Sequence, residues 1–226
     1  MRILSAFLAL LPLPALAESF SLPAGCTAYL TIQNKGCGVS HHFHCDNDPE
    51  GYQRRVDLDA DGINYVGSID YEARWMESFH VYSNHSEQLE GGSVDSASMT
   101  ELFAYGYDTY DFQTLSEEIG TTRYIGQDRL TGETVEIDGI MLEQTEYIIR
   151  ALDSDGIEKW RSEGHEFVSR DWRMFISGAG RVTTPSDSFD TDDSPVQFIL
   201  PGQNGFLTDT PIFGCSVVMS SFEVAG

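Results

Sequence analysis

The sequence predicts an all-β protein: an antiparallel meander that forms a barrel, a half-barrel or a sandwich, with at most one or two short helices. Three observations support this fold class. Apolar and polar residues alternate with period two along most of the chain. Glycine-rich turn signals separate these runs at short intervals, and 226 residues suit one large all-β domain. With 41% hydrophobic residues, the chain has enough apolar surface for a packed core.

The N-terminus has the features of a secretory signal peptide. Arg2 supplies a positive charge, residues 3–16 are largely apolar, and small residues lie at the expected cleavage position. Two prolines argue against the alternative, a buried N-terminal helix, and the run is too short to span a bilayer. We therefore expect a signal peptide at residues 1–17 and a single exported all-β domain at residues 18–226, periplasmic in a bacterium or otherwise secreted.

Strands are predicted wherever one face of the alternating pattern is apolar, because side chains of a strand point to opposite faces in turn. The clearest runs are residues 27–32, 74–82, 172–176, 196–200 and 216–224. Asp-Gly and other glycine-containing pairs tolerate the positive φ that tight hairpins need. They predict turns at residues 60–62, 131–132, 138–139, 155–156, 178–180 and 201–202.

Two segments depart from this pattern. A capping box from Ser98 to Glu101 predicts a short helix that ends at Gly106, with another strand as the alternative. Residues 183–195 contain two prolines and four aspartates, which predicts a solvated acidic loop.

The four cysteines, Cys26, Cys37, Cys45 and Cys215, predict disulfides if the chain is exported. Three lie within twenty residues and the fourth lies near the C-terminus. We expect one local bond and one that joins the two ends of the domain, which would make the first and last strands neighbours. The sequence leaves the pairing itself open, since four cysteines allow three arrangements.

Two metal sites are weaker alternatives, and the sequence requires no cofactor. A zinc or copper site would use side chains that lie within nine residues, namely Cys37, His41, His42, His44 and Cys45. On a strand, alternate residues point to opposite faces, which prevents all five from converging. A calcium site would use Asp57, Asp59 and Asp61, which copy the first half of an EF-hand loop. The second half departs from that pattern, and an acidic hairpin turn is the simpler interpretation.

The charge of the chain excludes some partners. Thirteen Lys and Arg against 36 Asp and Glu give a formal net charge of −23, which repels nucleic acid and anionic lipid surfaces. One segment, residues 159–181, is locally basic and rich in aromatic residues, and it predicts a site for an amphiphile with an anionic head group or for an acidic peptide. Its candidate binding residues are Trp160, Arg161, Phe167, Arg170, Trp172 and Arg173. The alternative is that these arginines pair with carboxylates while the aromatic residues fill the core.

Catalytic motifs are weak. The sequence contains neither a Gly-x-Ser-x-Gly elbow nor a Ser-x-x-Lys motif, and its six histidines have no informative spacing. We therefore expect a non-enzymatic binding or carrier protein whose partner is a lipid or another apolar or amphipathic small molecule. The first alternative is a disulfide-stabilised envelope domain, with or without calcium, that binds an envelope protein. The second is a carboxylate-based hydrolase.

Overall fold

The computed structural model describes residues 20–215, so the predicted signal peptide and the predicted strand at residues 216–224 lie outside the described residues. Within residues 20–215 there are thirteen strands and one helix, α1. In chain order they are β1 (Cys26–Asn34), β2 (Gly38–Cys45), β3 (Gln53–Asp59), β4 (Gly62–Ile69), β5 (Trp75–His80), β6 (His85–Leu89), α1 (Met99–Tyr105), β7 (Tyr107–Ser116), β8 (Gly120–Ile137), β9 (Ile140–Leu152), β10 (Glu158–Ser169), β11 (Met174–Thr183), β12 (Ser188–Asp192) and β13 (Pro195–Ile199).

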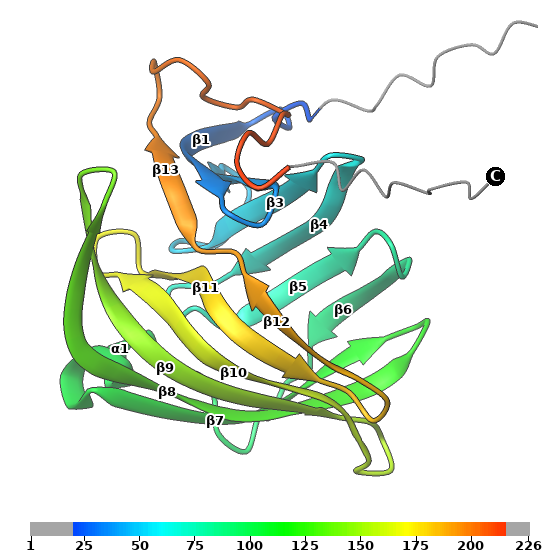
Figure 1. The fold of residues 1–226 in the computed structure, drawn as a ribbon. Helices are drawn as coiled ribbons and strands as arrows, with labels where there is room; N and C mark the ends of the chain where they lie inside the picture. Colours follow the sequence, from blue (N-terminus) through cyan, green and yellow to red (C-terminus); the bar gives the residue numbers. More distant parts are fainter. Residues whose placement is uncertain (1–19, 216–226) are drawn as a thin grey trace, which may run out of the picture.

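The strands form one antiparallel sheet in which neighbours along the chain pair with each other, apart from β13, which returns to pair with β1. The order β12-β11-β10-β9-β8-β7-β6-β5-β4-β3-β2-β1-β13 confirms the predicted meander. Figure 1 shows the sheet strongly curved around an interior, with long strands β7–β11 along one side and shorter strands opposite. The two edges do not pair, so the sheet is a rolled, unclosed half-barrel.

The two ends of the sheet overlap and pack against each other. Leu30 on β1 and Phe198 on β13 belong to one apolar cluster with Phe167 and Ile176. Those two residues lie on the face of β10 and β11 that points away from the cavity described below, because their chain neighbours Glu166 and Phe175 line it. The sheet therefore rolls past itself, and this seam holds the largest apolar cluster of the described residues.

A second layer covers the outer face of β1–β3. Val39, Phe43 and Leu58 are at most 3% exposed there, beneath side chains of the terminal segments that include Phe20 and Phe206. Both faces of β1 are thus largely buried, which explains why residues 27–32 lack charged side chains on either face.

Two disulfides hold the same corner. The bond Cys26–Cys45 links the paired strands β1 and β2, and Cys37–Cys215 joins the β1–β2 turn to the C-terminal segment. The expectation of one local bond and one end-to-end bond is confirmed, and β1 and β13 are neighbours as predicted. No thiolate is left for the zinc or copper site, since all four cysteines are paired.

The structure resolves the two departures from the strand pattern. Ser98 caps α1 by accepting a hydrogen bond from the Glu101 N–H at 3.2 Å, and Gly106 ends the helix with φ 82°, so the helix is confirmed. The loop predicted at residues 183–195 is wrong at its centre, where Ser188–Asp192 form β12 and pair with β11. Asp190 of this strand is exposed, so an edge strand satisfies the backbone while leaving the charge in water.

Candidate functional site

The concave face of the sheet encloses a cavity of about 740 Å³ that is partly open to solvent. This volume lies within the range typical of small-molecule sites. Its walls come from β3–β11 and from the β4–β5 loop. The aromatic and ionisable side chains of the lining include Arg55, Asp57, Tyr65, Trp75, His80, Glu87, Tyr110, Phe112, Tyr124, Asp128, Tyr147, Trp160 and Glu166.

An aromatic wall forms the largest apolar part of the cavity. Trp75 meets Phe112 and Tyr124 edge to face, with ring centroids 5.8 and 5.2 Å apart, and Phe112 stacks on Tyr124 at 5.3 Å. Trp160 adds a further contact with Tyr124 at 6.1 Å. Trp75 lines the cavity and is 42% exposed, so part of its surface is not covered by protein atoms.

Two glycines make room for tyrosine rings that lie flat along the strands. A Cβ on Gly126 would come within 2.6 Å of the Tyr110 ring, and one on Gly180 would come within 2.4 Å of the Tyr147 hydroxyl oxygen. A Cβ would also meet a backbone carbonyl oxygen, that of Ile148 at 2.4 Å for Gly126 and that of Glu163 at 2.9 Å for Gly180, so both positions require glycine.

Carboxyl groups lie on the same concave face. Asp128 pairs across the β7–β8 ladder with Asp108, and burial together with the charge of Asp108 raises the pKa of Asp128 to about 7. Burial raises the pKa of Glu166 well above its usual value, Asp128 raises it further, and Arg55 opposes the rise. Burial likewise raises the pKa of Asp108 to about 6, although the Ser98 N–H donates a hydrogen bond to its Oδ2 at 2.8 Å.

Arg55 is the cationic side chain of the cavity lining. Its Nε lies 3.1 Å from Asp57 Oδ2, and its guanidinium lies over the Tyr65 ring at 4.9 Å from the centroid. Neither the Arg55 Nε nor the Asp57 Oδ1 has a hydrogen-bond partner, although both atoms are shielded from solvent. Buried polar atoms normally have hydrogen-bond partners, so Arg55 and Asp57 each keep an atom that could bind a ligand.

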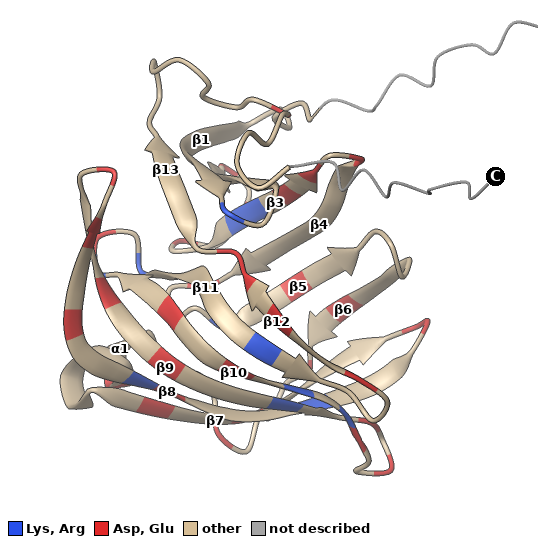
Figure 2. Ribbon diagram, in the orientation of Figure 1, with Lys and Arg blue, Asp and Glu red and all other residues tan. Residues whose placement is uncertain are grey.

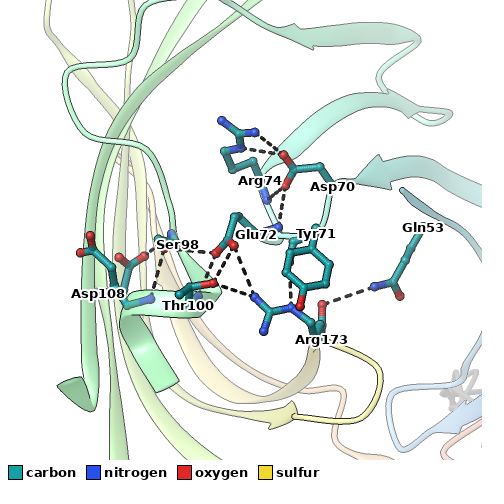
Figure 3. Close-up of polar contacts among 10 residues, drawn as sticks. Gln53, Asp70, Tyr71, Glu72, Arg74, Ser98, Thr100, Asp108 and Arg173 are labelled. Carbon is teal, nitrogen blue, oxygen red and sulfur yellow. Dashed lines mark hydrogen bonds and ion pairs between the residues drawn. The ribbon is translucent and has the colours of Figure 1, made fainter. Parts of the chain in front are cut away.

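A hydrogen-bonded cluster holds the β4–β5 loop beside the cavity (Figure 3). Glu72 in this loop accepts hydrogen bonds from Ser98 Oγ at 3.1 Å and from the Thr100 N–H at 2.8 Å, at the start of α1. Arg173, in the β10–β11 turn, donates to the Tyr71 carbonyl oxygen at 3.1 Å and to Thr100 Oγ1 at 3.0 Å. Three segments that are distant in the sequence are thereby fixed at one side of the cavity.

The sequence-predicted ligand site is not brought together as one group. Trp160 lines the cavity, whereas Phe167 and Trp172 belong to the seam, where Trp172 lies 5.8 Å from Phe198. Arg161 is exposed on the face of β10 opposite Trp160.

The other two arginines of that predicted site have structural partners. Arg170 pairs with Glu143, and Arg173 belongs to the cluster of Figure 3. Across the fold, acidic side chains are distributed over many strands and turns, so these basic residues find carboxylates nearby (Figure 2).

The predicted calcium ligands do not converge either. Asp57 points into the cavity, and Asp61 is exposed in the β3–β4 turn. Asp59 accepts hydrogen bonds from the Asp61 N–H at 2.8 Å, from Asn64 Nδ2 at 3.1 Å and from the Tyr82 hydroxyl. The turn thus uses the Asp59 oxygens internally, and calcium binding at these residues stays a prediction.

Most of the cavity lining was not predicted from the sequence. Tyr110 and Phe112 contact each other along β7, Phe112 also stacks across the strand pair on Tyr124, and all three rings line the cavity. The available signal was alternation in two neighbouring segments, with Tyr110, Phe112 and Thr114 on one face of β7 and Tyr124 opposite Phe112 on β8.

No protein-family model matches the chain, and neither a curated protein nor a solved structure matches it. Within residues 20–215, no helix is long and apolar enough to cross a membrane. The function is therefore inferred from the cavity itself.

Proposed function

We propose that this protein is a non-enzymatic binding or carrier protein that holds an amphipathic small molecule in the cavity of the rolled sheet. The observation that carries the proposal is an open volume of about 740 Å³ with an aromatic wall and carboxyl groups on the same concave face. Side chains around a cavity of this size make fewer packing contacts than those in a filled core, which lowers the free energy of unfolding. A ligand that fills the space would recover those contacts.

The apolar part of the ligand would lie against Trp75, Phe112 and Tyr124. Aromatic rings offer large rigid surfaces, and their edge-to-face contacts keep this wall in place without a ligand. The partial exposure of Trp75 is the area that an alkyl or ring system would cover.

The polar part of the ligand would be a cationic amine. The lining contains five acidic residues, Asp57, Glu77, Glu87, Asp128 and Glu166, against the single cation Arg55. Burial raises the pKa values of Asp128 and Glu166, and an ammonium group beside them would stabilise the charged forms of both carboxyls. This replaces the anionic head group that the arginine-rich segment suggested, since most of those arginines lie outside the cavity.

We further propose that the protein acts outside the cytoplasm, in the periplasm or after secretion. Both disulfides are compatible with an oxidising compartment, and the first 17 residues have the composition of a signal peptide.

Binding can be tested with dodecylamine below its micellar concentration, using tryptophan fluorescence of the disulfide-bonded protein. Two of the three tryptophans line the cavity, so the amine should change the emission, and dodecanoate should bind about tenfold more weakly, a difference of about 1.4 kcal/mol. Trp172→Phe should preserve the response, because Trp172 lies in the seam. Trp160→Phe combined with Trp75→Phe should abolish it.

The head-group assignment has its own test. The double variant Asp128→Asn with Glu166→Gln should remove the preference for the amine over the carboxylate. Glu163→Gln is the matched control, since Glu163 is an exposed carboxylate of β10 next to the cavity-facing Ser162. Absence of any response to either amphiphile would overturn the carrier proposal and favour the alternative, an envelope interaction domain.

A carboxylate-based hydrolase is the second candidate, and one observation favours it: the pKa values of two cavity carboxyls, Asp128 and Glu166, are both raised, as general acid catalysis requires. Mass spectrometry of molecules extracted from the purified protein distinguishes the two functions. A carrier should release its natural ligand unchanged after prolonged incubation. An enzyme should convert it, and Asp128→Asn should stop the conversion.

A further inference from the structure

The β5–β6 hairpin gathers two imidazoles and a carboxylate at one place. His80 ends β5, His85 begins β6, and the two are direct cross-strand partners on either side of the turn at residues 81–84. Glu87 lies two residues after His85 and so points to the same face. The ligand atoms of the three side chains all lie within 4.8 Å of one another, the one such group of three among residues 20–215.

We propose that His80, His85 and Glu87 form a binding site for a divalent transition-metal ion, with zinc as its representative. Two imidazole nitrogens and one carboxylate oxygen are a ligand set that suits zinc, whereas calcium and magnesium prefer oxygen ligands throughout. The site shares Glu87 with the acidic lining of the cavity, but metal binding can be tested without any amphiphile.

The two histidines lie side by side, and His85 keeps a ring nitrogen free for a ligand, whereas His80 Nε2 lies 3.3 Å from Ser78 Oγ. Their rings stack with centroids 4.5 Å apart and planes 8° apart. The Nδ1 of His85 is shielded from solvent without any hydrogen-bond partner, which is uncommon for a buried ring nitrogen. His80 Nε2 lies 3.5 Å from Glu87 Oε2. An ion held among the three side chains would account for this arrangement.

Residues of neighbouring strands orient the carboxylate. Thr114 Oγ1 donates to Glu87 Oε1 at 2.8 Å, and the Tyr124 hydroxyl lies 3.1 Å from both carboxylate oxygens. The Glu87 side chain is only 7% exposed, so these bonds fix it in one orientation. Such outer contacts are what positions the ligands of a metal site.

The site would leave part of the metal open. Three protein ligands leave at least one position of a zinc ion for water or another molecule. His80 and Glu87 line the large cavity, so the open position would face it. The charge of −23 also favours capture of a cation.

The test is a zinc titration of tag-free, disulfide-bonded protein that has been treated with a chelator, using a competing chromophoric chelator as readout. We expect one zinc per chain with a dissociation constant in the micromolar range or lower. His85→Ala and Glu87→Gln should each weaken binding at least tenfold. Thr114→Val should weaken binding less, because it removes one orienting bond and no ligand.

His165→Ala is the matched control. His165 on β10 also lies near a carboxylate, with its Nε2 3.7 Å from Glu146 Oε1, but within residues 20–215 this exposed pair has no third ligand. The variant should therefore leave zinc affinity unchanged. Cobalt should give d–d absorption bands that are lost in His85→Ala, provided that circular dichroism shows both proteins folded.

Three outcomes would overturn the assignment. They are binding weaker than millimolar, unchanged affinity in both folded variants His80→Ala and His85→Ala, or an equal loss in His165→Ala. If His85→Ala fails to fold, His85→Gln with the cobalt spectrum tests the same ligand, since an amide does not replace an imidazole in binding the metal.

Discussion

The corner built by β1–β3 and β13 differs from the hollow side built by β5–β11, although both belong to one sheet. In the corner, Leu30 faces the seam and Leu58 faces the terminal segments, and both disulfides lie there. Of its strands, β3 also borders the cavity. The hollow side has its concave face on a cavity lined by Trp75 and Tyr124, and part of its outer face is buried at the seam, where Phe167 packs. Stability is concentrated at the corner, and capacity for a ligand at the hollow side.

Removal of the Cys37–Cys215 bond, which lies in the corner, should lower the free energy of unfolding more than any other variant does. The bond closes a loop of 178 residues, so its loss in Cys37→Ser with Cys215→Ser should cost about 5 kcal/mol of unfolding free energy. Cys26→Ser with Cys45→Ser opens a loop of 19 residues and should cost about 3 kcal/mol. Urea denaturation of the two double variants measures both values. Equal losses would show that loop length does not govern them.

Truncation of a core side chain should give the second-largest difference in unfolding free energy between the two regions. Leu58→Ala at the corner should cost about 2 to 5 kcal/mol, because the site is 1% exposed and the cavity left behind cannot collapse fully. Trp75→Leu on the hollow side should cost about 1 kcal/mol, since part of this ring already lacks protein neighbours. A greater loss from Trp75→Leu, measured by the same urea denaturation, would mean that the aromatic wall and not the corner supports the fold.

The pH dependence of stability tests the buried acid of the hollow side. The pKa of Asp128 is about 7 in the folded protein against 3.8 as its ordinary value, so the folded state holds the proton more tightly. Its contribution to stability is therefore lost as pH rises from about 4 to 7. Asp128→Asn cannot ionise, and its stability relative to the original protein should rise by roughly 2 to 4 kcal/mol between pH 4 and 8.

The difference between variant and original protein reports Asp128 together with its effect on Glu166, whose pKa the Asp128 charge raises. His41, whose pKa burial lowers to about 4, titrates with the opposite sign but is present in both proteins. Asp155→Asn is the control, because Asp155 is exposed in a hairpin turn. Thermal melts at four pH values would suffice, and parallel curves for Asp128→Asn and the original protein would contradict the prediction.

Hydrogen exchange should reveal a smaller, local difference. Within residues 20–215, β6 pairs with β7 at Gln88–Leu115 and Leu89–Thr114, a much shorter ladder than the one joining β1 to β2. Amides of β6 should exchange at least about tenfold faster than those of β2, because local opening breaks fewer bonds. Zinc should slow exchange at β6 and leave β2 unchanged. Uniform protection across the sheet would remove the distinction.

Local patterns predicted the meander because each strand and turn depends on neighbouring residues. Alternation at residues 27–32 and 74–82 marked strands, and the Ser98 capping box marked α1. The end-to-end disulfide followed from the position of Cys215 far from the other three cysteines. The acidic strand β12 was missed because pairing with β11, and not its own composition, decides its conformation.

The functional residues could not be predicted in the same way. His80 and His85 have no informative spacing unless the turn between them is known to make them cross-strand partners. Asp128 and Glu166 lie on strands β8 and β10, with β9 between them. The sequence alone does not show whether a given carboxylate will be buried in the folded protein.

The sequence by itself determined most of the secondary structure, the antiparallel meander and the presence of one local and one end-to-end disulfide, since these follow from periodicity, turn residues and cysteine placement. Only the tertiary structure decided how tightly the sheet rolls, where its ends overlap and what interior space remains. Curvature and overlap result from packing between residues far apart in the sequence, such as Leu30 against Phe167. Periodicity assigns a side chain to a face of its strand, but it does not determine whether that face meets another layer or an empty volume.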